Sequence, residues 1–210
     1  MDTERADAIV LRRQPVTESS LLVTWFTREF GKLKTLAKGA RRPKSPMRGK
    51  IDLFYQDEIL FLRSRRSDLH LLHDCFLENP RANLRSSLAA LTAAAYAAEL
   101  VEVITEPEDP APDIFDLLAG TLDVLAAQPA AVVLVWFELR LLQAAGWTPP
   151  WRKSGPAAER VLGSLRAATL AGVRRVKLSD AQLQEARQLL WRFWDEQVGR
   201  SPKSRRLLAR

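Results

Sequence analysis

The sequence predicts an α+β protein in which a small five-stranded β-barrel precedes an all-α domain. The first 80 residues hold about five short segments that are rich in strand-forming residues and are separated by turns. After Asn79 and Pro80 the apolar residues recur at helical spacing. Hydrophobic residues make up 47% of the 210 residues, enough for real cores. Since the OB-fold is a five-stranded barrel, we expect an OB-fold at residues 1–80 and a helical domain at residues 81–210.

The expected strands are short. They cover residues 8–11, 20–27, 32–40, 51–62 and 69–77, the fourth as one strand or as two joined by a bulge. Gly31 predicts a hairpin turn before the third strand. Within that strand basic and apolar residues alternate, so one face should be basic and the other buried. The basic face carries Lys32, Lys34 and Lys38, interrupted by Leu36, and the apolar face carries Leu33, Thr35 and Ala37.

The second half reads as a bundle of helices. Leu84, Leu88, Leu91 and Ala95 predict a helix that ends before Pro107. Further helices are expected at residues 113–127, 130–145, 157–171 and 180–198. The segment 130–145 is apolar nearly all round, which is typical of the buried centre of a bundle. The last helix should begin with a capping box made by Ser179 and Gln182.

Charge limits the classes of ligand. The chain carries a net charge of +7 and has a pI near 10.0, which favours a nucleic acid, an anionic membrane or an acidic protein. The net charge is +4 over residues 1–80, −6 over 81–150 and +9 over 151–210. The longest apolar stretch, 130–137, is far shorter than the roughly 20 residues of a membrane span. No signal peptide is expected at residues 1–8, so we expect a cytoplasmic protein.

The segment 28–50 is the strongest functional feature. It holds nine basic residues against one acidic residue, Glu29, so a strand face and the following loop should form a cationic surface for phosphates. The nine are Arg28, Lys32, Lys34, Lys38, Arg41, Arg42, Lys44, Arg48 and Lys50. Nearby aromatic residues fit base stacking, but a place in the core is the favoured interpretation. These are Trp25, Phe30, Phe54, Tyr55 and Phe61.

Two other basic segments are candidates for the same role. Arg65 and Arg66 lie in an expected hairpin tip, where an extended DNA surface and a solvated turn are equally plausible. Lys203, Arg205 and Arg206 lie in a basic tail that is either a second DNA or partner contact or a frayed terminus.

The residues give no sign of an enzyme or a cofactor. His70, His73 and Cys75 resemble a metal cluster only briefly, because strand alternation sends the two histidines to opposite faces and no fourth ligand is at hand. Cys75 is expected to be a small buried residue. The sequence has no glycine-rich phosphate loop and no nucleophile elbow, so neither ATP hydrolysis nor nucleophilic catalysis is expected.

Residues along nearly the whole chain match one known family in their order and spacing. In the barrel they are Ala8-Ile9-Val10-Leu11, Glu18, Leu21-Leu22, Phe26-Thr27, Gly31 and the segment 36–42. In the helical half they are Tyr96, Glu99-Leu100, and the segments 115–118, 137–142, 146–149, 178–199 and 203–208. Together these residues resemble the RecO family of bacterial recombination mediators. One departure is clear: the stretch 150–156 lacks the four zinc-binding cysteines that many members carry there.

The resemblance implies a function and a set of partners. RecO-like proteins bind single- and double-stranded DNA, anneal complementary strands, and act with RecR, and with RecF, to load RecA onto DNA coated with the single-strand-binding protein SSB. They recognise the acidic, apolar C-terminal tail of SSB through the helical domain. Trp136 and Arg140 are candidates for this contact, and the competing interpretation is an ion pair of Arg140 with Glu138 or Asp123.

Two other functions stay open at this point. One is an RNA-binding OB-fold module, and the other is a cationic adaptor that binds acidic proteins without direct DNA binding. A preference for RNA would favour the first, and binding to SSB or RecR without DNA affinity would favour the second.

Overall fold

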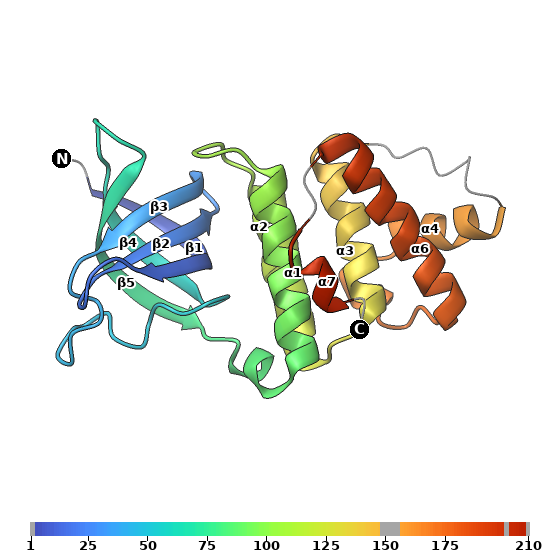
Figure 1. Ribbon diagram of the computed structural model, residues 1–210, viewed down its shortest axis with the longest axis horizontal. Helices are drawn as coiled ribbons and strands as arrows, with labels where there is room; N and C mark the ends of the chain where they lie inside the picture. Colours follow the sequence, from blue (N-terminus) through green and yellow to red (C-terminus); the bar gives the residue numbers. More distant parts are fainter. Residues whose placement is uncertain (1–2, 148–155, 200–201, 209–210) are drawn as a thin grey trace. The chain divides into compact units, whose positions relative to one another are not determined.

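The computed structural model describes residues 3–147, 156–199 and 202–208 (Figure 1). The chain forms two compact units, which we treat separately. The barrel unit comprises Met1–Arg81 and Thr105–Ala119, and the helical unit comprises Ala82–Ile104 and Gly120–Arg210. The single boundary expected near residue 80 stays a prediction.

The barrel unit is a closed five-stranded barrel, which confirms the predicted fold class of an OB-fold followed by helices. Its strands are β1 (Thr3–Pro15), β2 (Leu21–Thr27), β3 (Gly31–Ala37), β4 (Gln56–Leu62) and β5 (Leu69–Asn79). They pair in the order β1-β2-β3-β5-β4, and β4 returns to β1 (Figure 1). All pairs are antiparallel except the short parallel pair of β3 with β5.

The interior of the barrel follows the alternation of the strands. In β3, Leu33, Thr35 and Ala37 are buried while Lys34 is exposed, as predicted. Trp25 is fully buried, and its indole N–H donates to Thr35 Oγ1 at 2.8 Å. A bulge between Val10 and Arg12 shifts the register of β1 against β2. Bulges bend a strand and redirect the side chains that follow, here the exposed end of β1.

The expectation of strand structure at residues 51–55 and 38–40 is wrong. The chain there forms a loop in which Ala40, Met47, Ile51 and Phe54 are buried, the first three of them in the core of the barrel. Phe54 has a φ of 67°, a left-handed conformation that no strand accepts. Backbone hydrogen bonds hold it there, because Phe54 N donates to Val10 O at 2.9 Å and Val10 N donates to Tyr55 O at 3.0 Å.

Gly31 is required by the close approach of a second segment. Its φ is 66°, and a Cβ at this position would lie 2.0 Å from the carbonyl oxygen of Asp109. Glu108 N donates to Lys32 O at 3.0 Å beside this contact. The acidic segment that follows Ile104 is thus packed against β3 within the barrel unit.

The helical unit contains most of the expected helices. They are η1 (Ala82–Ser86), α1 (Leu88–Ile104), α2 (Pro112–Ala127, which begins in the barrel unit), α3 (Ala131–Ala144), α4 (Pro156–Ala167), α5 (Leu170–Val173), α6 (Asp180–Phe193), η3 (Trp194–Val198) and α7 (Arg205–Leu208). Helix α3 is buried along most of its length, and the Ser179–Gln182 capping box is present, both as predicted.

Two helical predictions need correction. The helix expected over residues 157–171 is two helices, because Thr169 adopts an extended conformation and its side chain caps α5 by accepting from Gly172 N. The last long helix is α-helical only to Phe193 and continues as a wider π-helical turn to Val198, which Gly199 ends with a φ of 69°. No helix in the described part of the chain is long and apolar enough to cross a membrane.

Candidate nucleic-acid interface

Six of the nine predicted cations bond to other groups of the barrel unit. Arg28 forms an ion pair with Asp116, and Lys34 pairs with Asp68 at 2.9 Å. Lys32 Nζ donates to Thr105 O at 2.7 Å, and Lys50 Nζ donates to Cys75 O at 3.1 Å. The strand face is basic in sequence, but carboxylates neutralise part of its charge in the structure.

The free positive charge gathers on the loop of residues 38–52, which we call the basic loop. Lys38, Arg42 and Lys44 are exposed there, and no ion pair links them to a carboxylate in the described part of the chain. Arg41 and Arg48 are also exposed and donate only to carbonyl oxygens, those of Thr17 at 3.1 Å and Pro43 at 3.3 Å. Five neighbouring cations are therefore presented to solvent by one loop.

The basic loop has a defined shape. Gly39, with a φ of 69°, begins a turn in which Arg42 N donates to Gly39 O. Arg41 N donates to Ser19 O at 3.0 Å, which fastens the loop to the β1–β2 turn. Two hollows flank the loop: one of about 340 Å³, lined by Lys38, Arg42 and Lys44 among others, and one of about 330 Å³, lined by Arg41, Arg48 and Arg13 among others.

Sequence reasoning missed Arg13. It lies after the bulge in β1, and its Nε pairs with Asp52 Oδ1 at 2.9 Å. The signal that could have identified it is the adjacent basic pair Arg12-Arg13, which directly follows an apolar strand segment.

The aromatic residues largely follow the core interpretation, although Phe30 and Tyr55 are only partly buried. Trp25, Phe54 and Phe61 are buried, so the core interpretation is confirmed for them. Tyr55 is partly exposed and lines the 330 Å³ hollow. Phe76, which sequence reasoning did not consider, is 45% exposed on β5, with Lys50 Nζ 5.6 Å from its ring centre.

The two other basic segments differ in their setting. Arg65 and Arg66 are exposed at the turn between β4 and β5, whereas Arg63 beside them pairs with Glu108 at 2.7 Å. Residues 202–208 are held in place rather than frayed, because the Glu99 carboxylate accepts from Lys203 N, Ser204 N and Ser204 Oγ at 2.6 to 2.9 Å. Arg205 pairs with Asp195 at 2.7 Å, and Arg206 is exposed.

The residues that resembled a metal cluster do not all lie on one face of β5. His70 is buried and His73 exposed, as strand alternation predicts. Cys75 is buried, and burial raises the pKa of its thiol to about 12, so it is not a nucleophile.

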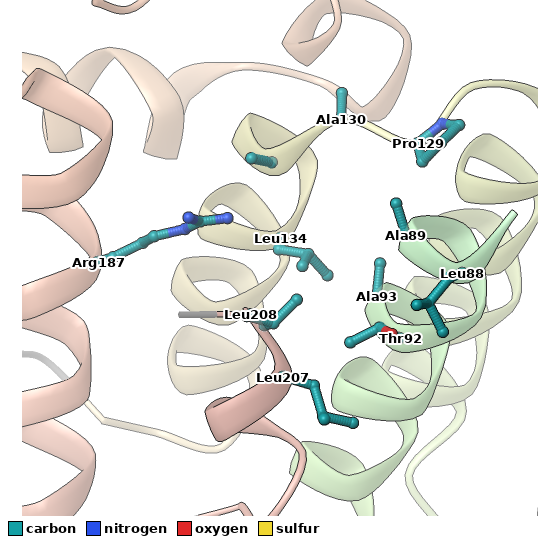
Figure 2. Close-up of a pocket in the computed structure, with 11 residues that line it drawn as sticks. Leu88, Ala89, Thr92, Ala93, Pro129, Ala130, Leu134, Arg187, Leu207 and Leu208 are labelled. Carbon is teal, nitrogen blue, oxygen red and sulfur yellow. The ribbon is translucent and has the colours of Figure 1, made fainter. Parts of the chain in front are cut away.

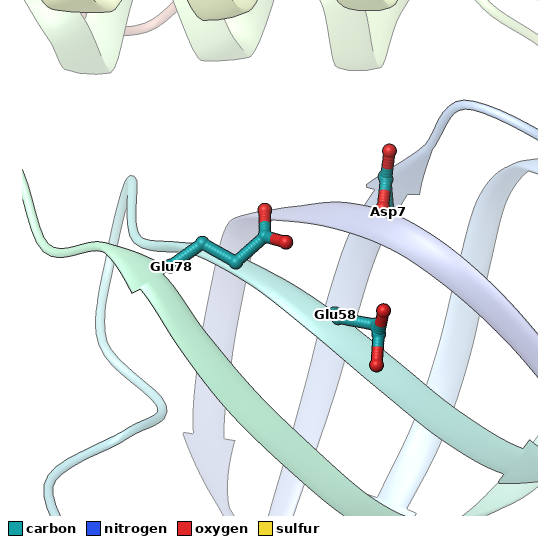
Figure 3. Close-up of side chains that lie close together, drawn as sticks. All are labelled: Asp7, Glu58 and Glu78. Carbon is teal, nitrogen blue, oxygen red and sulfur yellow. The ribbon is translucent and has the colours of Figure 1, made fainter.

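Three carboxylates on the outer face of the barrel come together instead. Oxygens of Asp7, Glu58 and Glu78 lie within 4.8 Å of one another (Figure 3). Arg5 forms an ion pair with Glu58, and Gln56 Nε2 donates to Glu78 at 3.4 Å. Protein groups therefore compensate part of this charge, and we assign no metal to it.

The helical unit contains an apolar groove of about 450 Å³. Leu88, Leu134, Leu207 and Leu208 line it, with Arg187 at one side (Figure 2). The side chain of Leu88 is 80% exposed and that of Leu207 57%. An apolar groove with one cation is suited to an apolar peptide segment that carries a carboxylate.

The residues proposed from sequence for a partner contact lie elsewhere. Trp136 is buried, and its indole N–H donates to Ala168 O at 2.9 Å, so its ring is committed to the core. Arg140 is exposed on α3. Glu138 is buried against Tyr96, so it is no ion-pair partner for Arg140, and burial raises the pKa of its carboxyl to about 8. Most of the stretch 150–156, where zinc ligands are lacking in the sequence, lies outside the described residues.

Comparison with known proteins covers both units. The family described as Recombination protein O N terminal matches residues 1–81, and Recombination protein O C terminal matches residues 85–160. The DNA repair protein RecO of Pelotomaculum thermopropionicum is 34% identical over 149 residues, which are 71% of this chain and 57% of that protein. The DNA repair protein RecO of a Cyanothece species is 37% identical over 150 residues, 70% of this chain and 50% of that protein. The chain thus spans between half and three-fifths of these relatives' length.

Proposed function

Because the chain belongs to the RecO family, we propose that it binds single-stranded DNA through the basic loop and promotes the pairing of complementary strands in recombinational DNA repair. The observation that carries this proposal is the cluster of exposed cations on the basic loop, unneutralised by carboxylates within the described residues. Phosphates bind such a surface mainly by releasing their counterions.

The proposed mechanism involves no covalent chemistry. Two DNA strands repel each other through their phosphates, and cations of the basic loop lower this repulsion while the bases search for partners. Phosphate contacts carry no sequence information, so binding should depend little on base sequence. The same surface would accept duplex DNA, the product of annealing, with comparable electrostatic attraction.

We place the contact with the SSB tail in the apolar groove of the helical unit. Leucine side chains and Arg187 there complement an acidic, apolar peptide. We place the contact there rather than at Trp136 and Arg140, because Trp136 is buried. Cooperation with RecR, and with RecF, in loading RecA is part of the same proposal.

Annealing of two labelled complementary strands tests the function. The strands are used bare and coated with SSB, with and without the protein. Faster annealing of coated strands supports the mediator function, since it needs both DNA and SSB contacts. Acceleration of bare strands alone supports a general nucleic-acid binder, and then competition with RNA distinguishes the RNA-binding alternative. No acceleration of either favours the adaptor.

Binding of a labelled SSB-tail peptide tests the groove. Arg187→Ala should weaken peptide binding about tenfold, as expected for loss of one charge-assisted contact. Arg192→Ala, an exposed arginine on the same helix outside the groove, is the matched control and should leave the affinity unchanged. Equal loss in both variants would indicate a general effect of charge.

A further inference from the structure

The 330 Å³ hollow beside the basic loop combines an apolar floor with a cationic rim. Leu21, Ala40, Met47 and Ile51 are buried and form the floor. Arg13, Arg41 and Arg48 are exposed and form the rim. We call this hollow the arginine pocket. Its volume lies at the lower end of small-molecule sites, so it is large enough for one nucleotide and too small for two.

The rim is fixed in place by bonds that leave donors free. Arg13 Nε bonds to Asp52, and one nitrogen each of Arg41 and Arg48 bonds to a backbone carbonyl oxygen. A guanidinium has five N–H donors, so each arginine keeps several for a ligand. With Asp52 included, the net charge of the pocket is +2, which attracts a phosphate group.

An unusual backbone corner supplies the remaining wall. Phe54, in the left-handed conformation, turns the chain so that Phe54 is buried while the next residue, Tyr55, lines the pocket. Arg81 Nη1 holds this corner by donating to Phe54 O at 3.0 Å, in addition to the two backbone bonds with Val10. An aromatic residue rarely adopts this conformation, and such corners are concentrated at binding sites.

We propose that the arginine pocket binds one unpaired nucleotide of a DNA strand, with the phosphate at the arginines and the base against Tyr55 and the apolar floor. A base that stacks on a tyrosine must expose its face, which a base within a duplex does not. The pocket therefore gives the barrel a preference for single strands that the basic loop alone, as a phosphate binder, does not supply. This inference rests on the proposed DNA binding.

Two strands of equal length separate the base contact from the phosphate contact. One is an oligothymidylate, and the other is a fully abasic strand that has the same phosphates without bases. The full-length protein should bind oligothymidylate about tenfold more tightly, as expected for one stacked base. Tyr55→Leu should abolish this difference and leave the affinity for the abasic strand unchanged. Tyr55→Phe should restore it, because the ring is kept.

Arg13→Gln should behave differently from Tyr55→Leu. It removes a phosphate contact, so it should lower the affinity for both strands by a similar factor, a few-fold. Phe76→Leu is the matched control, since Phe76 is a partly exposed aromatic residue of the barrel outside the pocket, and it should leave the preference for oligothymidylate intact. Thermal unfolding of each variant verifies that it is folded.

The outcomes are distinct. If the wild type binds both strands but Tyr55→Leu keeps the full preference for oligothymidylate, the pocket does not hold the base. If Tyr55→Leu weakens both strands equally in a folded protein, Tyr55 has only a structural role, which also overturns the proposal. If the wild type binds neither strand, the proposed DNA binding fails, and the pocket assignment fails with it.

Discussion

The basic loop should account for much of the salt dependence of DNA binding. Six cations lie on it, and no ion pair links any of them to a carboxylate in the described part of the chain: Lys38, Arg41, Arg42, Lys44, Arg48 and Lys50. If each neutralises one phosphate of a single strand, the logarithm of the affinity falls with the logarithm of the salt concentration with a slope of about −4. Between about 50 and 200 mM salt, the affinity then falls roughly 300-fold.

The triple variant Lys38→Ala/Arg42→Ala/Lys44→Ala removes half of these contacts. Its slope should be about −2, and the same change in salt should cost it only about 20-fold in affinity. Fluorescence anisotropy of a labelled oligothymidylate over a series of salt concentrations measures both slopes. The variant should remain folded, because all three side chains are exposed.

A second triple variant provides the control for net charge. Arg28→Ala/Lys34→Ala/Arg63→Ala removes the same three charges, but each of these cations already pairs with a carboxylate. Such cations release fewer DNA counterions, so the slope should change by less than one unit. If the control flattens the slope as much as the loop variant does, net charge rather than the basic loop governs binding, and our reasoning is refuted.

Three further predictions concern stability and reactivity. Gly31→Ala should lower the free energy of unfolding by at least about 2 kcal/mol, because φ is left-handed there and the added Cβ would meet the Asp109 carbonyl. Gly49→Ala has the same left-handed φ but open space around it, so it should cost only about 1 kcal/mol. Urea unfolding measures both. Burial raises the pKa of the Glu138 carboxyl to about 8. At a pH between the ordinary pKa of a glutamate and this raised pKa, the folded state keeps a proton that the unfolded state has lost. The free energy of unfolding should therefore fall as the pH rises through this range. Glu138→Gln should make this decline less steep, and an unchanged pH profile would exclude Glu138 as a source of it. Cys75 should resist alkylation until the protein is denatured, as measured by mass spectrometry.

The architecture was predictable because the spacing of apolar residues changes from alternating to helical after Asn79, where β5 ends and the helices begin. Alternation in β3 and the capping box at Ser179 are local signals, and both appear as expected. The corner at Phe54 was not predictable, because its left-handed conformation depends on hydrogen bonds with Val10, more than 40 residues earlier. Residues 51–55 are β-forming, so a strand is the natural prediction when the hydrogen bonds with Val10 are not known.

The candidate site was predictable in composition but not in detail. The sequence places nine cations within 23 residues, yet it does not say which of them meet carboxylates. Asp116 reaches Arg28 from 88 residues away, and Asp68 reaches Lys34 from 34 residues away. Arg13 joins the site only because the bulge in β1 and the folding of the basic loop bring distant segments together. Tertiary contacts of this kind leave no local pattern.

Closure of the barrel limits how partners associate with it. Each of the five strands pairs with a neighbour on both sides, although β3 and β5 pair over only three residues each. Paired strand edges leave an extended peptide or a second copy little backbone to join as an additional strand. Recognition by this unit should therefore rely mainly on side chains and loops, so substitutions of exposed side chains are a direct way to separate one partner from another.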